Sequence, residues 1–113
     1  MWIIVKKINN MKKLIRDKIP EIIKSEKRNC EYYIASDFEY SVELFKKIVE
    51  ESLEVQNSKN KDELIEEIAD VYEVINSICK NNWIDKAEIN KVRLEKKEKR
   101  WWFDKKYILE MDD

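Results

Sequence analysis

Apolar residues recur every three or four positions through the middle of the chain, which is the period of an amphipathic helix. The pattern predicts one helix from Asp37 to about Gln56 and a second that begins near Asn60 and ends before Asn82. The second helix carries an unbroken apolar stripe: Leu64, Ile68, Val71, Ile75 and Ile78. Because only a short polar segment separates the two helices, they should pair as an antiparallel hairpin.

The first of these helices has two apolar lines, and an acidic residue interrupts one of them. The uninterrupted line consists of Phe38, Val42, Phe45 and Val49. The other consists of Leu44, Ile48 and Val55, with Glu51 among them. A buried carboxylate is costly unless a cation or a basic group accompanies it. Glu51 is therefore the first candidate for chemistry.

Capping residues mark the starts of the predicted helices. Three pairs have the spacing of a capping box: Ser36 with Glu39, Asn60 with Glu63, and Asp85 with Glu88. The last pair begins a helix that is poor in apolar residues and runs to about Lys99. An earlier, short helix is expected from about Lys18 to Glu26, with Asp17 as its cap and Pro20 in the first turn, where proline is tolerated.

Two aromatic and β-branched segments could form a short β-hairpin, namely residues 30–35 and 107–111. Residues 1–10 are expected to be an N-terminal extension, with a short strand from Trp2 to Val5. Residues 11–113 are then a single helical domain, because 113 residues fit one domain, which at this size buries roughly two-thirds of its surface. Charged residues make up 42% of the chain, Gly is absent and Pro occurs once, so the composition favours an all-α, antiparallel four-helix, bundle-like fold.

Charge and cysteine content exclude several classes of protein. The 23 basic and 24 acidic residues nearly cancel, so no overall field favours a nucleic acid polymer or a membrane surface as partner. Cys30 and Cys79 lie far apart without a secretory signal, which predicts reduced thiols and a cytoplasmic location. The sequence contains no His, which disfavours zinc and the di-iron sites of helical bundles.

Two pairs of acidic residues have a spacing that suits metal binding. Glu51 and Glu54 are three positions apart on the first long helix, as are Glu67 and Asp70 on the second. Residues three apart lie on one face of a helix, so antiparallel pairing should bring both pairs around one cation. Four carboxylates make an oxygen-only site suited to Mg²⁺ or Mn²⁺, and without the cation some of their pKa values should be raised. Glu50 is a fifth carboxylate that can orient an attacking water.

These residues resemble a known signature. The pattern Glu50-Glu51-x-x-Glu54, followed after twelve residues by Glu67-x-x-Asp70, is similar to that of the all-α nucleoside triphosphate pyrophosphatases, the MazG-like superfamily. The opening KLIRDKIPEII, residues 13–23, and the later Lys96, Arg100 and Phe103 resemble its small single-domain branch, which is related to phosphoribosyl-ATP pyrophosphohydrolase.

The resemblance implies Mg²⁺-dependent hydrolysis of a nucleoside triphosphate, including non-canonical ones, to the monophosphate and pyrophosphate by a homodimer or homotetramer. It implies that the metal ligands are Glu51, Glu54, Glu67 and Asp70, and that Glu50 is an additional ligand or the base that activates water. It also implies that the residues in contact with the phosphates are Arg16, Lys18, Lys96 and Arg100.

The sequence departs from this signature at one point and leaves other functions open. Family members carry glycines after the arginine, where this chain has Trp101 and Trp102, and two indoles are not expected to reproduce a glycine turn. They could stack on a base, but packing at a subunit interface is favoured. Phosphoribosyl-ATP is an alternative substrate. A non-catalytic helical module for dimerisation or regulation is an alternative function, as is single-strand binding by residues 96–102, which Glu95 and Glu98 disfavour.

Overall fold

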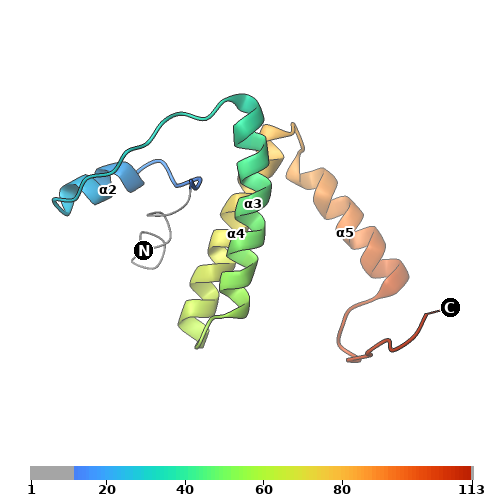
Figure 1. The fold of residues 1–113 in the computed structure, drawn as a ribbon. Helices are drawn as coiled ribbons and strands as arrows, with labels where there is room; N and C mark the ends of the chain where they lie inside the picture. Colours follow the sequence, from blue (N-terminus) through green and yellow to red (C-terminus); the bar gives the residue numbers. More distant parts are fainter. Residues whose placement is uncertain (1–11, 113) are drawn as a thin grey trace.

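Four helices make up the regular structure of residues 12–112, which are the residues that this computed structural model describes (Figure 1). They are α2 (Ile19–Ser25), α3 (Asp37–Gln56), α4 (Lys61–Asn81) and α5 (Lys86–Arg100). The all-α class is therefore confirmed. The predicted extension, residues 1–10, and the predicted strand from Trp2 to Val5 lie outside the described residues.

Helices α3 and α4 pack side by side and antiparallel, as the sequence predicts (Figure 1). The hairpin begins with the Ser36 hydroxyl, which accepts a hydrogen bond from the Glu39 N–H at 3.1 Å. The Glu39 carboxylate accepts from the Tyr33 hydroxyl at 2.6 Å, so the capping pair at this helix is only half formed. At α4 the Asn60 side chain accepts from the Glu63 N–H at 2.9 Å, as expected.

The shorter helices confirm one predicted cap and correct another. Asp85 and Glu88 form the capping box of α5. The Asp85 carboxylate accepts from the Ala87 N–H at 2.9 Å, and the Glu88 carboxylate accepts from the Asp85 N–H at 3.2 Å. Helix α2 begins after Lys18 without a side-chain cap, so the prediction that Asp17 caps it is wrong. The chain makes a turn there instead, in which the Ile19 N–H donates to the Arg16 carbonyl at 3.0 Å.

The predicted β-hairpin does not form: residues 30–35 and 107–111 contain no strand, and neither does any other part of residues 12–112. Paired strands must lie about 4.8 Å apart. The connector from α2 to α3 and the tail after α5 instead lie on opposite sides of the α3/α4 hairpin (Figure 1). In these two segments, an aromatic and β-branched composition therefore does not indicate strand pairing.

Helices α2 and α5 diverge from the central hairpin, so among residues 12–112 the bundle-like packing of helices is limited to α3 and α4 (Figure 1). The radius of gyration is 17.8 Å, whereas a compact chain of this length has about 13 Å. The buried apolar side chains among the described residues are Ile23, Leu44, Val74 and Cys79. None of the helices in residues 12–112 is both long and apolar enough to cross a membrane.

Helix α4 ends at a left-handed residue that would usually be glycine. Trp83 has a φ of 56°, and beside it the Ile84 N–H donates to the Cys79 carbonyl at 2.9 Å and the Trp83 N–H to the Lys80 carbonyl at 3.5 Å. This is the pattern of a Schellman motif. Trp83 is 95% exposed, so little packing compensates for the unfavourable contact of its Cβ.

The replacement Trp83→Gly is expected to stabilise the chain by about 1 kcal/mol, because glycine adopts a positive φ without this penalty. The change is measured by urea denaturation followed by circular dichroism. Trp83→Ala is the control, since alanine retains the Cβ and should give no such gain. Equal stabilisation by both replacements would mean that the indole side chain, and not the positive φ of the backbone at this position, is unfavourable.

Candidate metal centre

Three carboxylates from α3 and α4 converge in the half of the hairpin that is nearer the connection between the two helices. Glu51 comes from α3, and Glu67 and Asp70 come from successive turns of α4. One oxygen of each lies within 4.8 Å of the oxygens of the other two. Ligand oxygens on opposite sides of a bound Mg²⁺ or Ca²⁺ are about 4 to 5 Å apart, so this spacing is compatible with one shared divalent cation.

Glu51 is the most deeply placed of the three, with 5% of its surface exposed, whereas Glu67 and Asp70 are half-buried. Burial raises the pKa of Glu51, an effect that Lys47 opposes and that Asp70 and Glu50 reinforce. Burial also raises the pKa of Glu67, with further increases from Asp70, Glu51 and Glu54. The predicted upward shift is confirmed for both. A bound cation would relieve the repulsion that contributes to it.

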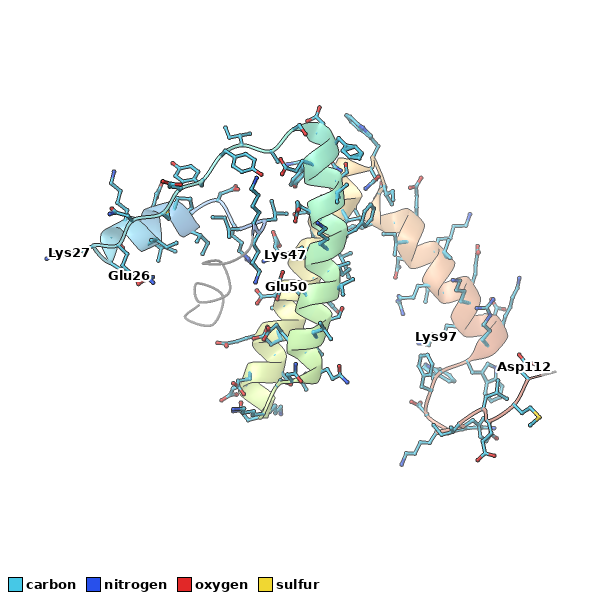
Figure 2. The ribbon with its side chains drawn as sticks, viewed as in Figure 1. Glu26, Lys27, Lys47, Glu50, Lys97 and Asp112 are labelled. Atoms are coloured by element: carbon cyan, nitrogen blue, oxygen red, sulfur yellow. The ribbon has the colours of Figure 1, made fainter. Side chains whose placement is uncertain are left out.

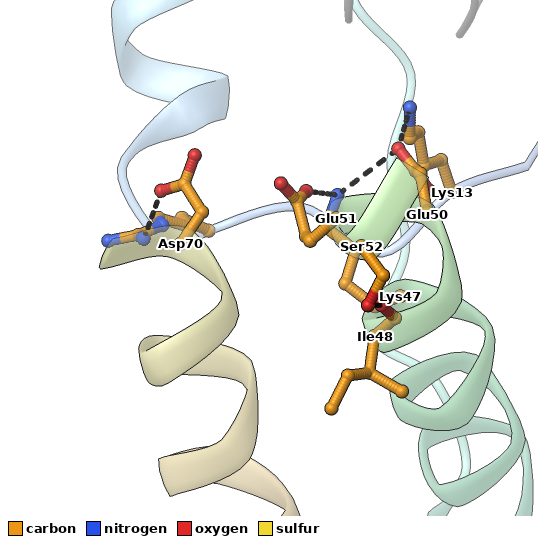
Figure 3. A network of polar contacts seen from close by, with 8 residues as sticks. Lys13, Lys47, Ile48, Glu50, Glu51, Ser52 and Asp70 are labelled. Atoms are coloured by element: carbon orange, nitrogen blue, oxygen red, sulfur yellow. Dashed lines mark hydrogen bonds and ion pairs between the residues drawn. The ribbon is translucent and has the colours of Figure 1, made fainter. Parts of the chain in front are cut away.

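Basic side chains of the same chain lie against these acids. The Arg16 guanidinium donates to Asp70 at 2.7 Å, and the Lys13 ammonium pairs with Glu50. Both come from the segment that precedes α2, which therefore lies across the acidic face of the hairpin (Figure 3). Lys47, one turn before Glu51 on α3, is 3.6 Å from Glu51 and 3.8 Å from Glu50.

Lys13 and Lys47 were not predicted from the sequence to be site residues. In the structure their side chains are only 9% and 12% exposed. For Lys47 the signal was present, because residues four positions apart on a helix are neighbours and Lys47 precedes Glu51 by four. For Lys13 no local signal existed. It lies 37 positions before Glu50 in sequence, and only the path of the chain brings the two together.

The other two predicted acids occupy different positions relative to the cluster. Glu50 lies beside Lys13 and Lys47, on the side of α3 that faces the segment before α2 (Figures 2 and 3). Glu54 is half-buried and is not one of the three converging carboxylates, although its charge raises the pKa of Glu67. Its role as a fourth ligand stays a prediction.

The predicted phosphate-binding residues are divided between two regions. Arg16 is at the acidic cluster, whereas Lys18 is the exposed residue that precedes α2. Lys96 lines a hollow of about 510 Å³ beside Ile84, Ile89 and Val92, and Arg100 ends α5. Since α5 diverges from α3 and α4, a single chain does not bring Lys96 and Arg100 to the cluster (Figure 1).

The aromatic tail corrects one expectation. Trp101 has a φ of 67° and a ψ of −148°, a conformation that glycine adopts readily, so at this position an indole does occupy a glycine-type backbone. Its ring lies 6.3 Å from that of Trp102. Lys105 lies 5.2 Å above Trp101, and Lys97 lies 5.1 Å above Trp102. Both rings thus contact cations of their own chain.

Residues 12–112 thus form an all-α protein of four helices with an oxygen-donor cluster, Glu51, Glu67 and Asp70, that could hold a metal ion. Comparisons of the chain with models of protein families, with curated proteins and with solved structures found no match.

Proposed function

We propose that this chain is a MazG-like pyrophosphohydrolase that cleaves a nucleoside triphosphate to the monophosphate and pyrophosphate with Mg²⁺. The observation that supports the proposal most is the convergence of Glu51, Glu67 and Asp70 within 4.8 Å. These are three of the four ligands that the acidic signature implies. They come from two different helices, so their proximity is a property of the fold and not only of the spacing.

The donors fit a hard divalent cation. Every oxygen in the cluster belongs to a carboxylate, the sequence has no His, and the one buried Cys, Cys79, lies at the end of α4. Such a donor set favours Mg²⁺ or Mn²⁺ over zinc or copper. When bound, Mg²⁺ would offset the negative charge of the phosphate oxygens and of the leaving pyrophosphate.

Glu50 is the residue that we assign to the attacking water. It would accept a proton from water as the water oxygen bonds to the α-phosphorus, while the bond from that phosphorus to the bridging oxygen breaks and pyrophosphate leaves. Lys13 and Lys47 pair with Glu50 and would hold its carboxylate in place on α3. Manganese should substitute for magnesium, because both accept oxygen ligands.

The replacement Arg16→Ala is expected to have opposite effects on metal and nucleotide binding. Without nucleotide, loss of the guanidinium beside Asp70 should strengthen Mg²⁺ binding by a factor of about 2 to 5, since exposed ion pairs contribute at most about 1 kcal/mol. Nucleotide binding should weaken, because Arg16 is 60% exposed and available to bind a phosphate. Titration calorimetry measures both.

Arg28→Ala is the matched control for this experiment. Arg28 also pairs with a carboxylate at 2.7 Å, that of Glu26, which caps the C-terminal end of α2, remote from α3 (Figure 2). It should change neither affinity. If Arg16→Ala also changes neither, Arg16 has no part in the site.

The proposed activity is tested by incubating the pure protein with Mg²⁺ and a panel of nucleotides while pyrophosphate is measured. The panel includes canonical and modified nucleoside triphosphates and phosphoribosyl-ATP. Release from at least one of them, dependent on Mg²⁺, is expected. No release from any, together with a melting temperature that does not respond to Mg²⁺, would favour the alternative of a non-catalytic helical module.

A further inference from the structure

The tail after α5 exposes a dense group of aromatic and aliphatic side chains. Every residue from 98 to 112 is exposed. The large apolar side chains of this part of the chain are 59% to 98% exposed, and they are Trp101, Trp102, Phe103, Tyr107, Ile108 and Leu109. A surface that stays in water does not usually carry so many large apolar groups side by side. We refer to residues 96–109, the last turn of α5 and this part of the tail, as the tail segment.

Positive charge is concentrated in the same segment. The tail segment has six basic and two acidic residues, a net charge of +4, whereas the whole chain has a formal net charge of −1. The basic residues are Lys96, Lys97, Lys99, Arg100, Lys105 and Lys106. None of these six forms an ion pair within residues 12–112. The near neutrality of the whole chain therefore conceals a positive field at one end of the molecule.

Two turns bring the basic and aromatic side chains of the tail segment onto one surface. In the first, the Trp101 N–H donates to the Lys97 carbonyl at 2.8 Å, and the positive φ of Trp101 redirects the chain. In the second, the Lys106 N–H donates to the Phe103 carbonyl at 3.1 Å. Lysine ammonium groups lie 5.1 and 5.2 Å above the two indoles. Cations and rings are therefore neighbours in space as well as in sequence.

This combination matches the surface of an anionic lipid bilayer. Tryptophan and tyrosine concentrate at membrane–water interfaces, where the ring meets the acyl chains and its polar edge meets hydrated headgroups. A basic residue near an anionic membrane contributes about fivefold to binding. Lysine can keep its ammonium among the headgroups while its carbon chain lies along the apolar layer.

A protein partner fits the composition of the tail segment less well. The sequence favours a subunit interface for Trp101 and Trp102. Lysine, however, is depleted at protein interfaces. Burial of Lys97 and Lys105 together with the rings that they contact would require an acidic group for each of them. A bilayer supplies negative charge without burying the ammonium groups.

Single-stranded nucleic acid also fits less well. Such strands bind by stacking their bases on the faces of aromatic rings. The rings of Trp101 and Trp102 are tilted by 60° to each other, and a lysine lies over each of them. Bases also offer no counterpart for the exposed aliphatic side chains of Ile108 and Leu109, whereas the acyl region of a bilayer does.

The position of the tail segment leaves it free to meet a flat surface. Helix α5 leads away from α3 and α4, and residues 12–18, which lie across the acidic face, are on the opposite side of the hairpin (Figure 1). An anionic surface would repel the acidic cluster, so it favours an orientation in which the tail segment makes the contact. Three acids, Glu110, Asp112 and Asp113, come after the segment and would remain in water.

We propose that the tail segment docks this protein on an anionic lipid bilayer. The apolar side chains of residues 101–109 enter the boundary between headgroups and acyl chains, and the six basic side chains contact lipid phosphates. The attachment is peripheral and reversible. The sequence-based expectation of no membrane partner rests on the total charge of the chain, whereas docking depends on where that charge lies.

Binding is tested by co-sedimentation of the full-length protein with lipid vesicles. Vesicles of equal parts phosphatidylglycerol and phosphatidylcholine are compared with vesicles of phosphatidylcholine alone. The wild type is expected to sediment with the anionic vesicles, to bind the neutral ones far more weakly, and to be released by added salt. The readout requires no nucleotide hydrolysis, so failure of this proposal and failure of the proposed activity are separate results.

The double variant Lys105→Gln/Lys106→Gln should weaken binding to anionic vesicles about 30-fold, as two contributions of roughly fivefold each. Lys59→Gln/Lys61→Gln is the matched control. It removes the same charge from two exposed positions beside the connection between α3 and α4, and should bind as the wild type does. Far-ultraviolet circular dichroism checks that both variants keep the helix content of the wild type.

Phe103→Ala tests the apolar contribution. The Phe103 ring is 98% exposed, so its loss should not affect folding, and withdrawing it from the lipid should weaken binding at least about tenfold. Ile34→Ala is the control, because Ile34 is an apolar residue, 95% exposed, in the connector before α3. It should leave vesicle binding unchanged.

Four results would overturn the proposal. Two concern the wild type: no binding to anionic vesicles, or equal binding to neutral ones. The third is unchanged binding by both Lys105→Gln/Lys106→Gln and Phe103→Ala, which would place any lipid contact elsewhere on the chain. The fourth is binding of an oligothymidine strand, lost in the lysine variant, by a protein that ignores vesicles. That result would assign the tail segment to single-stranded nucleic acid.

Discussion

Glu67→Gln is expected to abolish the rise in melting temperature that Mg²⁺ gives the wild-type protein and to reduce pyrophosphate release at least about 100-fold. Loss of groups that merely support metal ligands costs 10- to 100-fold, so loss of a ligand should cost more. A cation at a hundred times its dissociation constant stabilises the folded chain by about 2.7 kcal/mol, and the variant should lose this gain. Differential scanning fluorimetry and a pyrophosphate assay measure the two effects.

Without metal the same variant should be at least as stable as the wild type. Burial and the neighbouring acids raise the pKa of Glu67, which means that the folded chain disfavours its ionised form relative to the neutral one. A neutral amide removes that unfavourable contribution. Opposite effects with and without Mg²⁺ are characteristic of a metal ligand, because a purely structural residue would affect stability in the same direction in both conditions.

Glu66→Gln is the matched control. Glu66 is the preceding residue of α4, is exposed, and contributes to the raised pKa of Glu67 without belonging to the cluster. Its replacement changes the local charge by the same amount but removes no converging oxygen. If Glu66→Gln loses the Mg²⁺ response as fully as Glu67→Gln, general charge and not coordination explains that response.

Leu44→Ala is expected to destabilise the chain by about 2 to 4 kcal/mol, the range for truncating a buried leucine. Leu44 is 3% exposed and lies among the few buried apolar residues of the hairpin. It is seven residues, or about two turns, before Glu51 on the same helix, so loosened packing there should also weaken Mg²⁺ binding. Urea denaturation measures the loss of stability.

Lys46→Ala is the control for this replacement. Lys46 is two residues further along α3, its side chain is 69% exposed, and its ion pair with Glu43 spans 3.4 Å in solvent. Such pairs contribute less than about 1 kcal/mol. A loss for Leu44→Ala no larger than that for Lys46→Ala would contradict the assignment of the α3/α4 contact as the core of the chain.

The cations around the cluster affect how these experiments are designed. Lys13 and Arg16 arrive from outside the hairpin, and Lys47 comes from α3 itself. Together they pair with Glu50, Asp70 and Glu51, and so reduce the repulsion among acids in the metal-free chain. Metal titrations should therefore be made at fixed ionic strength, because salt screens the exposed pair of Arg16 and Asp70.

The positions of the helices could be predicted from the sequence because the signals are local. Asn60 with Glu63 and Asp85 with Glu88 mark the starts of α4 and α5 within a few residues of chain, and the structure confirms both. The failed prediction of an Asp17 cap is also local, since a turn at that position competes with the helix. The β-hairpin failed for a different reason. It required residues 30–35 and 107–111, which are over seventy positions apart in sequence, to lie side by side. Composition does not indicate whether two remote segments approach each other in space.

For the candidate site, the sequence alone determined which acids lie one turn apart on which helix, because the period of the α-helix fixes that geometry. Only the tertiary structure decided that Glu51 converges with Glu67 and Asp70, that Lys13 and Arg16 lie against the acidic face, and that α5 carries Lys96 and Arg100 away from it. These relations depend on how remote segments pack. Each results from many weak contacts summed over the chain, which no local pattern of residues specifies.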